Sequence, residues 1–313
     1  MTVKVVETID THTLGEPTRT VVAGFPRLRG RTLAARSADL LARHDSLRCA
    51  LMWEPRGHRM MFGAVVVPPA AASADVGLVF MDGGGAVPMC VHGTIGAVTA
   101  LVETGRLRVP GDRLVVDTPD RPLEVGIRRQ GRRVAEVSLL APPARVVRRG
   151  LEAKSGRRRV AYDLAYAGNL VALVEARQLG VELEPAQAAR LIEAGTAVKH
   201  AAQSVMPEVV ACVIHEERGP GRYRDFVAFR DGSCDRSPCG SCFAALMALL
   251  HEQGRLEPGT WTECESVLGL SFRGRLLARA GELVPELVGS AFITGEHWFR
   301  IDALDPLRHG FVL

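Results

Sequence analysis

The feature that most limits what this chain can fold into is a repeated order of parts in its two halves. In each half, a β-hairpin is followed by a helix, then by strands, and then by a short cysteine-containing loop that opens into an apolar helix. Cys90 follows the turn residue Gly15 by 75 positions, and Cys239 follows Gly168 by 71 positions. Matching elements in the same order and at similar spacing predict a duplicated α/β unit.

Alternating apolar residues and turn-forming residues place the two hairpins. The first hairpin is expected to pair residues 3–9 with residues 18–23 across a turn rich in Gly and Pro. The second hairpin is expected to pair residues 159–164 with residues 170–175. Its turn is centred on Gly168, so both hairpins turn at a glycine.

Capping residues place the helix that follows each hairpin. Ser37 is the expected N-cap of a helix over residues 38–52. Pro185 fits the first turn of a helix over residues 186–194, and Gly195 is expected to end that helix. The leucines expected on the buried face of the first helix are Leu40, Leu41, Leu47 and Leu51.

The length and the duplication together predict two domains. A chain of 313 residues is long enough for about two domains. The first lobe is expected over residues 1–155 and carries Cys90, with residues 296–313 returning to complete it. The second lobe, over residues 156–295, carries Cys239. The boundary is expected near the polar run of residues 152–159.

Composition excludes several classes of protein. Basic residues exceed acidic ones only by 39 to 35, and aromatic residues make up 5%, so we expect no nucleic-acid partner. The most apolar stretch, residues 63–81, contains Pro68, Pro69 and Asp75, so we expect no membrane span. The N-terminus shows no signal peptide, and seven cysteines are too sparse for a disulfide scaffold. These features predict a cytoplasmic protein with reduced thiols; whether it forms a homodimer stays open.

The two cysteine loops carry the chemistry. The helices that they open are expected to stop at Gly105 and near Gly254. A helix N-terminus stabilises an anion, which lowers the pKa of a cysteine placed there. Two such loops facing each other would hold a small carboxylate with one sulfur on each side. This arrangement suits removal of a proton from one face of a carbon and delivery of a proton to the other face, without a metal or an organic cofactor.

The sequences of the two loops resemble the active-site motifs of the proline racemase family. The motifs are Met89-Cys-Val-His-Gly-Thr-Ile95 and Asp235-Arg-Ser-Pro-Cys-Gly240, and the resemblance extends over the whole chain. The family also includes 4-hydroxyproline epimerases and trans-3-hydroxyproline dehydratases. The resemblance implies an α/β protein of two pseudo-symmetric lobes with the diaminopimelate-epimerase-like architecture. Each lobe would be a curved sheet around a central helix, with the active site in the cleft between lobes.

The resemblance also implies a role for each matching residue. Cys90 and Cys239 would be the catalytic acid/base pair, and a small amino acid would be the substrate. His92 and Asp235 would face the substrate nitrogen. The residues whose backbone N–H groups would hold the substrate carboxylate are Val91, His92, Gly240 and Ser241. The residues that would flank the substrate ring are Phe62 and Phe229.

These residues predict a racemase or epimerase, but they do not determine whether the substrate ring carries a hydroxyl group. Two apolar rings give a hydroxyl no hydrogen-bond partner, at a cost of about 1–3 kcal/mol, which favours free proline. His92-Gly93-Thr94 looks more like the epimerase version of the loop, so 4-hydroxyproline 2-epimerase is the alternative. Both cysteines are present, which argues against the dehydratases. The residues that depart from the usual pattern of the family are Val91, Cys242 and Phe243.

The spacing of the cysteines also fits other functions. Cys239-x-x-Cys242 is the spacing of thiol–disulfide oxidoreductases, and it also raises the question of a regulatory disulfide. With Cys234 it resembles a ferredoxin spacing that lacks its fourth cysteine. A binding protein without turnover is a further alternative. The cysteines expected only to fill cores are Cys49, Cys212 and Cys264.

Overall fold

The computed structural model describes residues 3–229 and 232–313, which form two compact units. The first unit comprises residues Met1–Leu139 and Ser290–Leu313, and the second comprises Leu140–Gly289. The division therefore falls before the predicted boundary. Residues 145–155 form a strand that pairs with residues 158–166, so they belong to the second unit.

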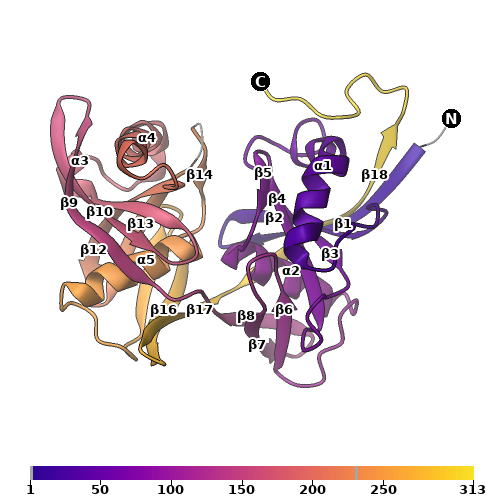
Figure 1. Ribbon diagram of the computed structural model, residues 1–313, viewed down its shortest axis with the longest axis horizontal. Coiled ribbons are helices and arrows are strands. Elements are labelled where there is room, and N and C mark those ends of the chain that lie inside the picture. The colour runs from indigo at the N-terminus through magenta and orange to yellow at the C-terminus, as the bar shows by residue number, and fades with distance from the viewer. Residues whose placement is uncertain (1–2, 230–231) are drawn as a thin grey trace. The chain divides into compact units, whose positions relative to one another are not determined.

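The first unit is a mixed sheet with two helices. Its strands pair in the order β18-β1-β2-β3-β4-β6-β7-β8, with the short β5 beside β4. β18 is the last strand of the chain, and it pairs antiparallel with β1 along the whole length of β1 (Figure 1). The elements are β1 (Val3–Thr13), β2 (Glu16–Ala23), α1 (Leu33–Met52), β3 (Phe62–Val67), β4 (Val76–Asp82), β5 (Gly85–Val87), α2 (Val91–Glu103), β6 (Arg113–Asp117), β7 (Leu123–Gln130), β8 (Arg133–Leu140) and β18 (Ala291–Asp302).

The second unit is built in the same way. Its strands pair in the order β9-β10-β11-β12-β13-β15-β16-β17, with the short β14 beside β13. The elements are β9 (Arg145–Ser155), β10 (Arg158–Tyr166), β11 (Leu170–Glu175), α3 (Ala176–Leu179), the 3₁₀ turn η1 (Pro185–Gln187), α4 (Ala188–Val205), β12 (Ala211–Gly219), β13 (Arg222–Ala228), β14 (Cys234–Asp235), α5 (Gly240–Glu252), β15 (Thr262–Ser266), β16 (Ser271–Arg279) and β17 (Glu282–Gly289).

The two strand orders also match in direction. In the first unit the parallel pairs are β2–β3 and β4–β6, and in the second they are β11–β12 and β13–β15; the other pairs in both orders are antiparallel. The long helices follow the same strands: α1 and α4 come after the hairpins, whereas α2 and α5 come after the short strands. The predicted duplication of an α/β unit is confirmed.

Each unit buries one helix on nearly all sides. Residues 91–101 of α2 and 240–250 of α5 are all buried, as expected of helices that are apolar around their whole circumference. Strands that lie between the central helix and the other long helix of a unit are buried on both faces. For example, β11 reads Leu-Val-Ala-Leu-Val, without the alternation of a half-exposed strand. α1 packs with Val65, Val79 and Met81, whereas Phe80 lies against α2. The sheet therefore separates an outer from a central helix.

Three local predictions for the first unit are wrong. The first turn is confined to Leu14 and Gly15, because β1 runs on to Thr13 and β2 begins at Glu16. Helix α1 begins at Leu33 rather than after Ser37, and the Thr32 side chain accepts a hydrogen bond from the Ala35 N–H at 3.1 Å. Burial of Leu33 favours this extra turn. Leu41 is 41% exposed, since it lies off the stripe formed by the other three leucines.

Gly195 does not end its helix. The 3₁₀ turn contains Pro185, and α4 then runs through Gly195 to Val205. A Cβ atom on Gly195 would lie 2.6 Å from the Cβ of Ala228, so the glycine lets the helix approach β13 closely. The second hairpin, β10–β11, forms as predicted. Among the described residues, no helix is long and apolar enough to cross a membrane.

Candidate active site

Cys90 is the N-cap of the central helix of the first unit. Its backbone is extended, with φ −149° and ψ 126°, and its Sγ accepts a hydrogen bond from the Gly93 N–H at 3.3 Å. The Thr94 hydroxyl donates to the Cys90 carbonyl oxygen at 2.6 Å. The Sγ also lies 3.3 Å from Nδ1 of His92. A half-buried thiol therefore lies between a helix N-terminus and an imidazole.

An aromatic ring and a hairpin hold this loop. The Phe62 ring meets the His92 ring edge-on, with centroids 4.6 Å apart. Gly93 makes room for it, because a Cβ there would lie 2.7 Å from Phe62 Cε1. The Thr13 hydroxyl, beside the hairpin turn, donates to the His92 carbonyl oxygen at 2.9 Å. The structure thus brings Phe62, Val91 and His92 to Cys90, with Val91 3% exposed.

Cys239 is the N-cap of the central helix of the second unit. Its φ of 43° is uncommon for a residue with a side chain, and strain of this kind concentrates at functional sites. Asp235 supports the loop, since its Oδ1 accepts hydrogen bonds from the N–H and the hydroxyl of Ser237, both at 2.8 Å. The Ser237 hydroxyl in turn accepts from the Cys239 N–H at 3.3 Å.

The second hairpin holds its loop as the first one does. The Asn169 side-chain amide, at the hairpin turn, donates to the Ser241 hydroxyl at 3.1 Å. The Ser241 Oγ lies 3.7 Å from the Cys239 Sγ. Asn169 was not predicted as a site residue. Asn169 lies in the turn of the second hairpin, which corresponds to the Leu14-Gly15 turn of the first hairpin. This correspondence could have identified it from the sequence.

The pKa of Cys239 differs from the expectation for a helix N-terminus. The Cys242 thiol donates a hydrogen bond that lowers the pKa of Cys239. Burial and the nearby Asp235 carboxylate act in the opposite direction and prevail, so the pKa of Cys239 lies above its usual range. Cys239 is 6% exposed, and this burial favours its neutral thiol form.

The remaining predicted residues, Gly240 and Phe229, belong to the second unit. Gly240 is buried at the start of α5. Phe229 is half-buried after β13, where the neighbouring strand β14 leads to Asp235. The Phe229 carbonyl oxygen accepts a hydrogen bond from the buried Lys199 Nζ at 2.8 Å, which fixes its backbone. Within each unit, the structure therefore brings several predicted residues to the cysteine at the start of the central helix.

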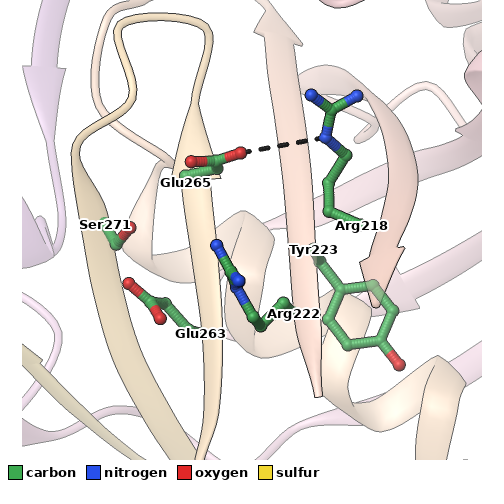
Figure 2. Close-up of a pocket in the computed structure, with 6 residues that line it drawn as sticks. All are labelled: Arg218, Arg222, Tyr223, Glu263, Glu265 and Ser271. Atoms are coloured by element: carbon green, nitrogen blue, oxygen red, sulfur yellow. Dashed lines mark ion pairs between the residues drawn. The ribbon is translucent and has the colours of Figure 1, made fainter. Parts of the chain in front are cut away.

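A small pocket lies elsewhere in the second unit, among β12, β13, β15 and β16. Figure 2 shows its charged side chains, where Arg218 Nε lies 4.0 Å from Glu265 Oε1. Charges of opposite sign compensate one another here, as in a surface ion-pair network. None of its lining residues belongs to a cysteine loop. Across residues 3–229 and 232–313, no group of three or more His, Cys, Asp or Glu side chains is arranged to hold a metal ion.

Comparisons with known proteins agree with this architecture. Residues 8–312 match the proline racemase family. The chain is 37% identical to the proline racemase of Clostridioides difficile over 98% of both chains, and 36% identical to the 4-hydroxyproline 2-epimerase of Paracoccus denitrificans over 100% of both. The structure of a hydroxyproline epimerase from Agrobacterium vitis, solved with bound trans-4-hydroxy-L-proline, superimposes with a TM-score of 0.91 at 28% identity, covering 99% of this chain and 95% of that one. The chain therefore belongs to the proline racemase family and is an isomerase acting on proline or hydroxyproline.

Proposed function

We propose that this chain racemises free proline by a two-thiol mechanism that needs no cofactor. One observation carries the proposal: the two copies of one structural unit each place a cysteine, Cys90 or Cys239, as the N-cap of the buried central helix. A duplicated unit that presents the same reactive group twice matches a reaction with two mirror-related proton transfers.

The reaction balances without any further reactant. In one direction, the thiolate of one cysteine removes the α-proton of the substrate, and the thiol of the other delivers a proton to the opposite face of the carbon. The product leaves with inverted configuration, and the two cysteines have exchanged protonation states. The substrate carboxylate must accept negative charge as the α-proton leaves, so donors aimed at it lower the barrier.

The two helix N-termini supply those donors. The first N–H groups of a helix have no acceptor within the helix, and they point at an anion placed before its first turn. We assign the carboxylate to the N–H groups of Val91 and His92 in α2 and of Gly240 and Ser241 in α5. Asp235 and the imidazole of His92 are assigned to the substrate nitrogen.

The surroundings of the two cysteines favour one resting state. Burial keeps Cys239 protonated, whereas the half-buried Cys90 lies beside an imidazole that can share its proton. We therefore assign the acid role to Cys239 and the base role to Cys90 in the form of the enzyme that accepts its first substrate. Both thiols must be reduced, which places the proposed activity in a reducing compartment such as the cytoplasm.

The ring-facing residues favour proline over hydroxyproline. The Phe62 ring lies against His92 and beside the Cys90 loop, and a phenyl ring gives a ring hydroxyl no hydrogen-bond partner. Phe229 is the second aromatic residue assigned to the ring. An unpaired hydroxyl costs on the order of 1–3 kcal/mol, or about tenfold to a hundredfold in affinity.

A specific observation supports the alternative, 4-hydroxyproline 2-epimerisation. The solved relative from Agrobacterium vitis holds trans-4-hydroxy-L-proline, and the epimerase from Paracoccus denitrificans is almost as similar to this chain as the proline racemase is. Sequence identity does not separate the two substrates.

Parallel assays decide between them. L-Proline, trans-4-hydroxy-L-proline and trans-3-hydroxy-L-proline are incubated with the enzyme, and the products are separated by chiral chromatography. We expect kcat/KM to be at least about tenfold higher for proline. A preference for trans-4-hydroxy-L-proline would make the chain an epimerase. Loss of water from the third substrate would overturn the assignment as an isomerase of free proline.

A Phe62→Ser variant tests the structural reason for the preference. It opens space and adds a hydroxyl beside His92. We expect kcat/KM to fall for proline and to rise relative to proline for trans-4-hydroxy-L-proline. A uniform fall for both substrates would show that Phe62 supports the loop without selecting the substrate.

A further inference from the structure

Cys242 is a second thiol beside the proposed catalytic one. It is the third residue of α5 and is fully buried, and its thiol donates a hydrogen bond to Cys239. The Phe243 N–H donates to the Cys239 carbonyl oxygen at 2.9 Å, so Cys239 lies in the same first turn. Helix geometry places Cα atoms three residues apart about 5 Å from each other. This separation lies within the range that a disulfide spans.

The second unit also buries the carboxyl group of Asp225. Asp225 of β13 is 0% exposed, and the Cys264 thiol donates a hydrogen bond to it. Its pKa is raised well above its usual range, mainly by burial and then by Asp235. Asp225 contributes in turn to the raised pKa of the Cys242 and Cys264 thiols.

This arrangement has no role in the racemisation described above, which uses only Cys239 of the group. A carboxyl group buried to this extent is costly to retain in its charged form. Burial also raises the pKa of Cys242 well above its usual range.

We propose that Cys239 and Cys242 form an oxidative modification site, at which a hydroperoxide converts the two thiols to a disulfide that switches the enzyme off. The proposal rests on the proposed role of Cys239 in the reaction. A dithiol reductant reverses the modification and returns both thiols.

The oxidation proceeds in two balanced steps. The Cys239 thiolate attacks one peroxide oxygen, the O–O bond breaks, and an alcohol or water leaves, so that Cys239 becomes a sulfenic acid. The sulfur of Cys242 then attacks the Cys239 sulfur, the S–O bond breaks, and the hydroxyl group leaves as water with the Cys242 proton. The hydroperoxide is reduced by two electrons, and the two thiols are oxidised by two.

Cys242 also protects Cys239 from deeper oxidation. A sulfenic acid without a neighbouring thiol goes on to sulfinic acid, which a dithiol does not reduce. Because the pKa of Cys239 is raised, its thiolate fraction grows as the pH rises above neutrality. We therefore expect inactivation by hydrogen peroxide to be faster at pH 9 than at pH 7.

The test treats the wild-type enzyme and a Cys242→Ala variant with hydrogen peroxide, and each is compared with its own untreated activity. Wild type is expected to form a Cys239–Cys242 disulfide, mapped by mass spectrometry after alkylation, and to recover its activity in dithiothreitol. The variant is expected to acquire two oxygens on Cys239 and to stay inactive in dithiothreitol. Cys212→Ala removes a buried thiol of β12 outside this group and is expected to behave as wild type.

Two outcomes would overturn the proposal itself: no Cys239–Cys242 disulfide in oxidised wild type, or recovery by dithiothreitol in Cys242→Ala. Disulfide mapping needs no turnover, so it decides on the modification even if no imino acid is racemised. A disulfide that forms while racemisation continues unchanged would contradict the role of Cys239 in catalysis as well as the switch.

Discussion

The Sγ of Cys90 lies 3.3 Å from Nδ1 of His92, two residues further along the chain. Both residues lie at the start of α2, where the Gly93 N–H also donates to the sulfur. The sulfur of Cys90 therefore contacts both an imidazole nitrogen and a backbone N–H donor. In the second unit, Ser241 takes the position that corresponds to His92, so the two cysteines have different partners.

Replacement of His92 tests this difference. An imidazole at this distance can take the thiol proton, whereas a glutamine amide cannot. We expect His92→Gln to lower kcat/KM by about tenfold to a hundredfold and to slow alkylation of Cys90 by iodoacetamide at pH 7. Ser241→Ala is the corresponding change beside Cys239 and should leave alkylation of Cys90 unchanged. Equal alkylation rates in wild type and His92→Gln would contradict activation by the imidazole.

Arg19 is expected to stabilise the first unit strongly. Its guanidinium donates to the Asp10 carboxylate at 2.8–3.1 Å and to the carbonyl oxygens of Leu51 and Arg56, both at 2.6 Å. Removing one partner of a buried pair leaves an uncompensated charge, so Arg19→Met should cost about 3–5 kcal/mol. Arg19→Lys should recover only part of this, because lysine lacks the planar fork.

Urea denaturation measures this loss of stability. Arg43→Met is the matched control, since Arg43 pairs with Asp39 on the surface of α1 and such pairs contribute about 0–1 kcal/mol. Similar losses for the two variants would show that the buried pair contributes no more than a surface one.

Gly195→Ala is expected to destabilise the second unit, although alanine is the better helix former. Helix propensity alone would favour alanine by about 1 kcal/mol. The added Cβ would lie 2.6 Å from Ala228 Cβ, and overpacking of this kind costs about 1–3 kcal/mol. Thermal unfolding should show a lower Tm. Ser204→Ala, at an exposed position of the same helix, should not lower it. A raised Tm for Gly195→Ala would contradict the close approach of α4 to β13.

His215 is expected to make the fold sensitive to acid. Burial lowers the pKa of His215 to about 4, from an ordinary value near 6.5. Below pH 6.5 the unfolded chain binds a proton that the folded chain does not, so stability falls as the pH falls towards 4. From pH 7 to pH 4.5 this group should cost about 2 kcal/mol.

Denaturation at both pH values measures this cost. His215→Gln should lose correspondingly less stability on acidification than wild type does. His200→Gln, on the exposed side of α4, should lose as much as wild type. No difference between the two variants would show that His215 is not buried in its neutral form.

Local sequence signals predicted much of the fold. The cysteine loops open helices that end close to Gly105 and Gly254, both with positive φ, because capping and left-handed turns depend on nearby residues. The order of hairpin, helix and strands also repeats as expected, since turn glycines and alternating residues mark it. The buried cysteines of the cores, Cys49, Cys212 and Cys264, are confirmed as well.

Predictions that depended on distant contacts were less reliable. The sequence predicted that Gly195 ends its helix. In the structure Gly195 lies within the helix, where its lack of a side chain allows the close approach to Ala228. Thr32 and Ser37 are both acceptable caps, and the burial of Leu33 decides between them. The pKa of Cys239 was expected to be low from its helix position alone. Burial and Asp235 raise it, and neither is visible in the local sequence.

Exchange of the substrate α-hydrogen in heavy water tests the two-thiol proposal most directly. Proline is incubated with wild type, Cys90→Ser and Cys239→Ser, and deuterium at the α-carbon is followed by NMR alongside optical rotation. Cys49→Ser, which changes a buried thiol of α1, is the control for folding and should behave as wild type. We predict exchange with racemisation in wild type and the loss of both in each of the first two variants. Racemisation that persists in Cys90→Ser or in Cys239→Ser would contradict the two-thiol mechanism.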